Sequence, residues 1–109
     1  MGEYQIAEIS IDATGRLLIH PEIILNESYE YIYRSAMGVH WLANERSLMA
    51  PKPKEWSYLS WFKQIMNAVA DEYGDHLILC DTTKWSNVPT EIKESIEKWC
   101  EGNPPNKSL

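Results

Sequence analysis

The hydrophobic pattern in the first part of the chain has the two-residue period of β-strands. Within residues 6–11, Ile9 and Ile11 fall on one face and polar residues on the other. Residues 12–15, Asp-Ala-Thr-Gly, are typical of a turn because Asp bonds the backbone ahead of it and Gly accepts a positive φ. Residues 16–20 are mainly apolar and suit the return strand. These segments together predict a β-hairpin.

Further strands are expected before the period changes. Residues 29–34 alternate, with three tyrosines on one face, and residues 39–42 and 47–49 are short apolar runs typical of strands. Residues 22–28 are compatible with either a helical turn or a bulged strand. Residues 51–54, Pro-Lys-Pro-Lys, cannot donate regularly to a strand ladder, so we expect a stiff extended connector there.

From Trp56 to Tyr73 the apolar residues follow the helical period instead. Gly74 is a natural C-terminal stop for such a helix. The pattern predicts an amphipathic helix of roughly five turns. Its apolar stripe consists of Tyr58, Leu59, Phe62, Ile65, Met66, Val69 and Tyr73.

One more strand and a second helix are predicted after this long helix. Residues 77–80 are apolar on both faces, which is typical of a covered central strand. Residues 81–87 are expected to form a loop, and a shorter helix follows with Pro89 near its start. Its apolar stripe consists of Val88, Ile92, Ile96 and Trp99. Residues 102–109 are polar and contain two adjacent prolines, so we expect a disordered tail.

This succession of elements predicts an α+β fold. The expected order is β-β-β-β-(β)-α-β-α, with one mainly antiparallel sheet of about five to six strands and both helices on one face. A chain of 109 residues is long enough for one domain, which we expect to span residues 1–101.

The charge balance restricts the class of partner. Ten Lys and Arg residues stand against sixteen Asp and Glu residues, which gives a net charge of −6. Nucleic acids and anionic membranes attract concentrated positive charge, so this balance argues against both. No apolar run approaches the ~18 residues of a membrane-spanning helix, and the first residues lack the features of a secretion signal. We therefore expect a cytoplasmic protein.

Motifs for catalysis or metal binding are not found in the sequence. The three histidines lack the spacing of a metal motif, and only the fold could bring His40, His76 and Asp81 together. Cys80 lies in an apolar run and is expected to be an inert buried thiol, whereas Cys100 lies at a helix end, where the dipole does not favour a thiolate. We expect no catalytic residue, no metal and no cofactor.

The aromatic composition is unusual, with five Trp and six Tyr residues against a single Phe. Trp and Tyr are favoured where a ring is partly buried and partly meets solvent or a partner. Trp61 projects about 100° from Phe62, off the centre of the helical stripe, and Trp56 lies on the other flank. These rings either cap a small core or line a contact surface. The candidate aromatic contact residues are Trp56, Trp61, Trp85, Tyr29, Tyr31 and Tyr33.

The second predicted helix has an acidic exposed side. Its acidic residues are Glu91, Glu94, Glu97 and Glu101, against Lys93 and Lys98. Such a side is either simply solvated or a surface for a basic partner, because opposite charges speed encounter and aromatic anchors hold a complex together.

Residues 15–19 (Gly-Arg-Leu-Leu-Ile), 31–34 (Tyr-Ile-Tyr-Arg) and 51–58 (Pro-Lys-Pro-Lys-Glu-Trp-Ser-Tyr), followed by Trp61 and Phe62, form a recognisable set. They resemble small bacterial proteins carried on mobile integron gene cassettes, some of which are classed with immunity proteins of toxin systems. The resemblance covers most of residues 4–100, and its motifs are structural rather than catalytic. It implies a non-enzymatic protein that neutralises a toxin by binding it.

The sequence thus predicts a non-enzymatic, immunity-like binding protein that captures a basic protein partner, such as a toxin, through an acidic and aromatic surface. The alternatives are a small-molecule-binding domain with an aromatic-lined cleft between sheet and helix, and a small enzyme of unknown reaction. A homodimer is compatible with any of these. The predicted surface consists of Trp56, Trp61, Trp85, Tyr29, Tyr31, Tyr33, Glu91, Glu94 and Glu97.

Overall fold

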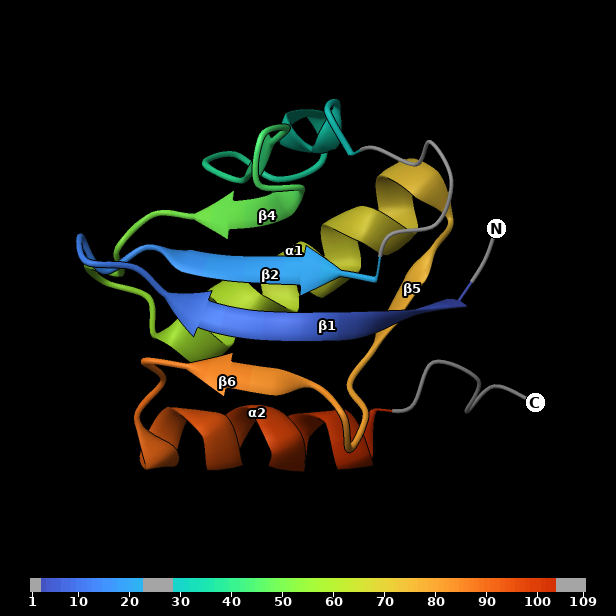
Figure 1. Cartoon of the computed structure of the whole chain (residues 1–109). Helices are drawn as coiled ribbons and strands as arrows, with labels where there is room; N and C mark the ends of the chain where they lie inside the picture. The colour runs from blue at the N-terminus through green and yellow to red at the C-terminus, as the bar shows by residue number, and fades with distance from the viewer. Residues whose placement is uncertain (1–2, 23–28, 104–109) are drawn as a thin grey trace.

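The computed structural model describes residues 3–22 and 29–103. Within these ranges the chain forms six strands and two α-helices in the order β-β-β-β-α-β-β-α, and a short 3-10 helix, η1 (Ile32–Arg34), follows the second strand (Figure 1). The α+β class is confirmed, as is a mainly antiparallel sheet with two helices.

One half of the sheet is antiparallel and is built outward from the first strand. β1 (Glu3–Ile11) pairs with β2 (Leu17–Pro21), which pairs with β4 (Ser47–Ala50), and β4 pairs with the edge strand β3 (His40–Leu42). The predicted hairpin is therefore confirmed as β1 and β2 with a turn over residues 12–16.

On its other side β1 pairs in parallel with two short strands. β5 (His76–Ile78) pairs with the start of β1, and β6 (Lys84–Ser86) pairs further along it. A strand is confirmed near the predicted residues 77–80, but its predicted central position is wrong, because β5 is an edge strand and ends at Ile78. The chain leaves β1 after β5 and returns as β6, inside the predicted loop. Between the two, the Thr83 hydroxyl donates to the Ile6 carbonyl at 2.7 Å and replaces a ladder hydrogen bond.

The predicted strand over residues 29–34 is also wrong, since this segment forms a turn and η1. Tyr29 is buried, and its hydroxyl donates to the Asp75 carboxylate at 3.2 Å. Its ring meets Trp41 and Tyr73 edge-on, with centroids 5.5 and 4.9 Å apart. These long-range contacts bury Tyr29, whereas Tyr31 and Tyr33 are exposed. A regular strand would place all three tyrosines on one face.

The two helices lie close to their predicted positions. α1 (Tyr58–Tyr73) begins after the N-cap Ser57, two residues later than predicted, and ends at Gly74, whose φ of 70° is left-handed. α2 (Thr90–Gly102) includes the first residue of the predicted tail. The expectation of disorder in the rest of that tail, residues 104–109, lies outside the described residues.

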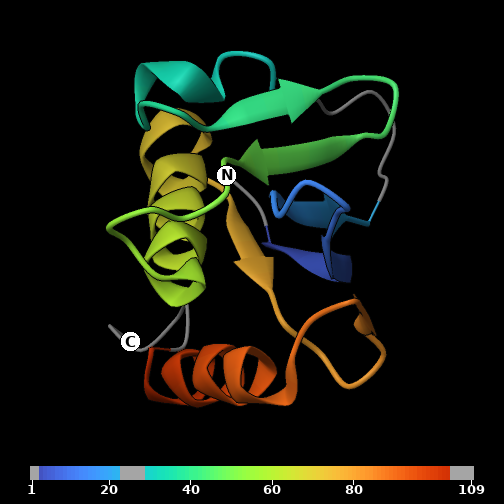
Figure 2. The ribbon, with the colours of Figure 1, turned by 90° about the vertical axis from the view of Figure 1, so that its left-hand side faces the viewer.

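The core lies between α1 and one face of the sheet (Figure 2). α2 runs along the β6 edge, and its C-terminal end lies on the side of α1, where Trp99 meets Phe62 edge-on at 5.9 Å. Over the described ranges, no helix has the length and apolar character needed to cross a membrane. Fully buried side chains of this core include Ile9, Leu17, Ile19, Leu48, Phe62, Ile65 and Val69.

Candidate functional site

The connector between β4 and α1 forms one side of an open cleft of about 540 Å³, which we call the tryptophan cleft. Trp56 is 48% exposed, and its ring contacts that of Trp61, with centroids 4.9 Å apart and planes 50° apart. The two rings predicted to flank the apolar stripe of α1 are thus brought together. The cleft is lined by Pro51, Lys52, Lys54, Glu55, Trp56 and Trp61.

Two glycines with positive φ make room for the walls of the tryptophan cleft. A Cβ at Gly38 (φ 91°) would lie 3.2 Å from the Cη2 atom of Trp61. A Cβ at Gly15 (φ 89°) would lie 2.9 Å from the Cγ and Cδ atoms of Lys52. Both lining side chains are therefore packed against backbone that only glycine keeps open.

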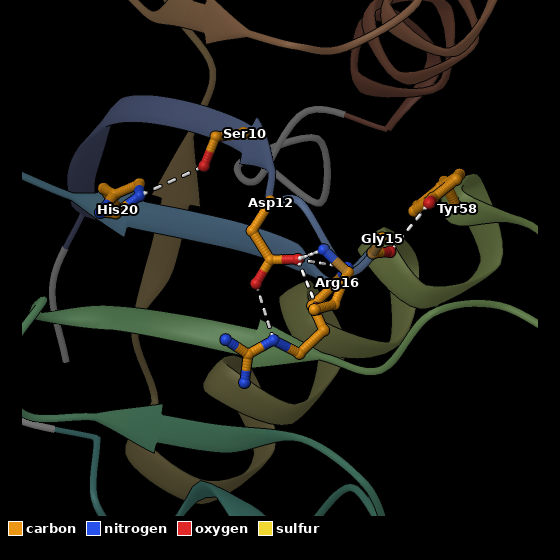
Figure 3. Close-up of polar contacts among 7 residues, drawn as sticks. Ser10, Asp12, Gly15, Arg16, His20 and Tyr58 are labelled. Atoms are coloured by element: carbon orange, nitrogen blue, oxygen red, sulfur yellow. Dashed lines mark hydrogen bonds and ion pairs between the residues drawn. The ribbon is translucent and has the colours of Figure 1, made fainter.

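Lys52 packs against the β1–β2 turn, which is stabilised by Asp12. The Oδ1 atom of Asp12 accepts hydrogen bonds from the N–H groups of Thr14 and Arg16 (Figure 3). Its Oδ2 accepts the Arg16 guanidinium N–H at 2.7 Å. Partial burial would raise the pKa of the Asp12 carboxyl, but the hydrogen bonds from Arg16 and Thr14 outweigh it and hold this pKa well below its usual range. The Tyr58 hydroxyl donates to the Gly15 carbonyl at 2.8 Å, which ties α1 to the same turn.

The tryptophan cleft is locally positive although the chain as a whole is negative. Its charged groups are Lys52, Lys54 and Glu55, and none of them forms an ion pair within the described part of the chain. The first turn of α1 has no acidic side chain, so the positive end of its helix dipole is not offset there.

Trp85 and the acidic residues of α2 form a separate surface. The Lys93 ammonium lies 5.8 Å from the centroid of the Trp85 ring and 3.7 Å from the Glu97 carboxylate. Glu91 and Glu94 are exposed beside them. Since no residue of α2 lines the tryptophan cleft, the surface that the sequence predicts as one is divided into two.

The three candidate tyrosines are also divided. Tyr29 belongs to the core, whereas Tyr31, the N-cap residue of η1, and Tyr33 within η1 are exposed. The Arg34 guanidinium lies 4.4 Å from the Tyr31 ring centroid. The neighbouring Met37, which sequence reasoning did not single out, is 91% exposed. Tyr31 and Tyr33 do not line the tryptophan cleft.

The histidines do not form a common site. His40 lies on β3 and His76 on β5, at opposite edges of the sheet, so about four strand spacings, or about 19 Å, separate them. Among residues 3–22 and 29–103, no three His, Cys, Asp or Glu side chains are grouped so that they could hold a metal ion. The fold therefore does not bring His40, His76 and Asp81 together.

A second cleft, of about 450 Å³, lies between α1, β5 and α2. Burial raises the pKa of the Cys100 thiol in its wall to about 11, and the nearby charge of Glu97 adds to this effect. This cleft lies between sheet and helices, as the small-molecule alternative expects, but among the described residues Trp99 is the one Trp, Tyr or Phe that lines it, and none of the nominated aromatic residues does. The lining residues are Met66, Asn67, Ala70, His76, Leu77, Ile78, Leu79, Trp99, Cys100 and Asn103.

Cys80 is not the inert buried thiol that its apolar neighbours indicate. It lies after the end of β5 and is partly exposed, with its Sγ atom 3.2 Å from the Thr82 hydroxyl and 3.4 Å from the Thr83 hydroxyl. Hydrogen bonding to Thr82 and Thr83 lowers the pKa of this thiol. In the sequence, the nearby Thr82 and Thr83 could have indicated that the strand ends before Cys80, because threonines with an Asp favour a turn.

Sequence reasoning missed most of the wall of the tryptophan cleft. It singled out the two tryptophans but interpreted residues 51–54 only as a connector, although the same stretch carries the family resemblance. Gly15 was expected to close a turn, and its contact with Lys52 depends on a long-range approach that no local pattern reveals.

Comparisons with known proteins identify related sequences. A family model described as Integron Cassette Protein Hfx_Cass5 matches residues 4–83. A solved structure from the mobile metagenome of North West Arm Sewage Outfall, titled Integron Cassette Protein Hfx_Cass5, is 42% identical. The match covers 87% of this chain and 92% of that chain, with a TM-score of 0.42. Among curated proteins no match was found.

Proposed function

The chain belongs to the Hfx_Cass5 family of integron cassette proteins, and we propose that it is a binding protein that captures a basic protein partner, as an immunity protein captures a toxin. The exposed tryptophan pair carries this proposal. Trp56 is 48% exposed yet held against Trp61, and tryptophan is enriched among the residues that dominate binding energy. Rings already held in place lose little conformational freedom on binding, which favours affinity.

The charge of the chain supports a basic partner. A net charge of −6 produces a long-range field that attracts positive surfaces, and the exposed Glu91 and Glu94 add to it on α2. In this proposal the charge speeds the encounter, and the tryptophan cleft holds the complex together.

Three immobilised baits test this proposal: the wild-type chain, Trp56→Ala and Tyr33→Ala. Tyr33 is 52% exposed and lies outside the cleft, so Tyr33→Ala is a matched loss of an exposed ring. We expect a basic protein from the host lysate to be retained by wild type and Tyr33→Ala but lost from Trp56→Ala. For a purified partner, losing a hot spot of about 2 kcal/mol corresponds to roughly 30-fold faster dissociation.

The retention experiment also has outcomes that contradict the proposal. Retention of the same proteins by Trp56→Ala would show that the tryptophan cleft is not the contact surface. A partner that is acidic would contradict the electrostatic part. The melting temperature of Trp56→Ala serves as the folding control, because the loss of a half-exposed ring should leave it nearly unchanged.

A second candidate function is small-molecule binding in the cleft between α1, β5 and α2. Its volume of about 450 Å³ is typical of ligand pockets. A bound compound would raise the melting temperature of wild type, and Ala70→Phe, which places a ring in this cleft, should abolish the rise. An equal rise in both proteins would contradict binding at this cleft.

A further inference from the structure

We infer that the tryptophan cleft accepts an acidic segment of the protein partner, in which an apolar or aromatic side chain lies next to a carboxylate. This inference rests on the proposed function and names the chemistry of the part of the partner that enters the cleft. The partner as a whole is basic in the proposal, but a basic protein also carries acidic side chains at its surface.

The lining residues carry the inference. Two lysines, Lys52 and Lys54, and one acidic residue, Glu55, line the cleft, and neither lysine forms an ion pair within the described residues. The indole rings of Trp56 and Trp61 provide apolar surface beside these cations. The cleft therefore combines apolar surface with an excess of one positive charge among its lining side chains.

The packing of the Lys52 side chain against the β1–β2 turn favours the binding of a carboxylate by its ammonium group. Its Cγ and Cδ atoms lie against Gly15, at 2.9 Å from the position that a Cβ would take, so its stem is placed on the β1–β2 turn. That turn is itself held by the carboxylate of Asp12 and by the hydroxyl of Tyr58. A stem that packs against the turn has less side-chain entropy to lose when its ammonium group binds a carboxylate.

The local charge of the cleft and the net charge of the chain lead to opposite expectations. The net charge of −6 favours a positive ligand everywhere, whereas the cleft favours a negative one. Coulomb energy falls with distance and salt screens exposed charges beyond about 8 Å at physiological ionic strength, so the nearest groups decide at contact. Two probes of similar size and opposite charge can therefore separate the two effects.

The probes are the peptides acetyl-Trp-Glu-amide and acetyl-Trp-Lys-amide, added to the full chain labelled with 5-fluorotryptophan. Fluorine NMR then reports on the five tryptophans, each assigned with a Trp→Phe variant. We expect the Glu peptide to shift the signals of Trp56 and Trp61, with a Kd about tenfold below that of the Lys peptide at physiological ionic strength, where the net charge of the chain is screened. This ratio is what two exposed charge contacts would produce.

Two double variants test which lysines set the preference. Lys52→Gln with Lys54→Gln should remove the preference for the Glu peptide. Lys84→Gln with Lys98→Gln changes the net charge equally, on exposed residues of β6 and α2, and should leave it intact.

Three results would overturn the inference: equal or tighter binding of the Lys peptide, binding of neither peptide, or a preference that survives loss of Lys52 and Lys54. In each case the retention of a partner by wild type and its loss from Trp56→Ala would still decide the proposed function independently. The two ideas therefore fail separately.

Discussion

Single glycines determine where the side chains of the tryptophan cleft lie, because their missing Cβ atoms leave the space that Trp61 and Lys52 occupy. Gly38→Ala is therefore expected to lower the free energy of unfolding by about 1–2 kcal/mol, since an L-residue is strained at φ 91°. Urea denaturation followed by circular dichroism measures this effect.

Gly102→Ala is the control for that measurement. Beyond its chain neighbours and the backbone of its own helix, no atom of the described residues lies within 4 Å of the position that its Cβ would take. Gly102 is also the last residue of α2, so the substitution should be neutral or slightly stabilising. Equal losses in the two variants would contradict a special role for Gly38.

The two cysteines are expected to differ in reactivity, and Cys80, which its apolar neighbours indicate to be inert, is expected to be the more reactive one. Hydrogen bonding to Thr82 and Thr83 lowers the pKa of Cys80, whereas burial and Glu97 raise the pKa of Cys100 to about 11. At pH 8 only about one Cys100 thiol in a thousand is then ionised, and the thiolate is the reactive form.

Thiol titration with Ellman's reagent on the single variants Cys80→Ser and Cys100→Ser measures each rate alone. Cys80 should react faster at pH 8. The Cys100 rate should rise about tenfold per pH unit and continue to rise toward pH 11, since its folded-state pKa is raised. A faster reaction of Cys100 at pH 8 would contradict the structural account.

At the scale of elements, two neighbouring residues of α1 lie on different faces of the helix, one toward the core and one toward the tryptophan cleft. Phe62 is fully buried, whereas Trp61 is only partly buried and packs beside Gly38 and Trp56. Phe62→Ala should cost about 3–5 kcal/mol of unfolding free energy, and Trp61→Ala clearly less. The midpoints of urea denaturation compare the two, and equal shifts would contradict the assigned faces of the helix.

The elements that the sequence predicts correctly are those specified by local periodicity. The β1–β2 hairpin has alternating residues and a turn with its own hydrogen bonds at Asp12, and α1 has an unbroken apolar stripe that ends at Gly74. In both, neighbouring residues contain the information that determines the structure.

The elements that sequence reasoning misplaces depend on distant partners. Tyr29 does not lie in a strand, because its hydroxyl binds Asp75 and its ring packs against Tyr73, both more than forty residues later in the chain. β6 exists because β1 offers an open edge for pairing, and its own three residues carry no strand pattern. The tryptophan cleft could be predicted only in part. The helical pattern singles out its two rings, but no local pattern predicts the contacts with Gly15 and Gly38 that position its walls.

At the scale of the whole molecule, the charges have an uneven distribution that no helix or strand reveals alone. The acidic residues of α2 lie with Trp85 along the β6 edge, and the cations Lys52 and Lys54 lie at the tryptophan cleft. Under the proposed function, long-range attraction and short-range contact therefore involve different surfaces of the molecule. A partner that uses both must span from α2 to the first turn of α1.

This separation predicts that salt and tryptophan substitutions act on different rate constants for the protein partner. Raising the salt from 0.01 M to 0.15 M shortens the screening length from about 30 Å to about 8 Å, so the association rate of wild type should fall by about tenfold or more. The dissociation rate should change much less, because it depends on the contacts at Trp56 and Trp61.

The source of the attractive field can be located with two variants of equal net charge. Glu91→Gln with Glu94→Gln removes two exposed carboxylates from α2, whereas Glu22→Gln with Glu45→Gln removes two exposed carboxylates elsewhere. If α2 faces the incoming partner, the first variant should lose clearly more of the salt dependence of the association rate than the second, although both have the same net charge. Surface plasmon resonance at the two salt concentrations measures both rates. An association rate that ignores both salt and the α2 glutamates would contradict steering, because a field that attracts a basic surface must weaken when its charges are removed or screened.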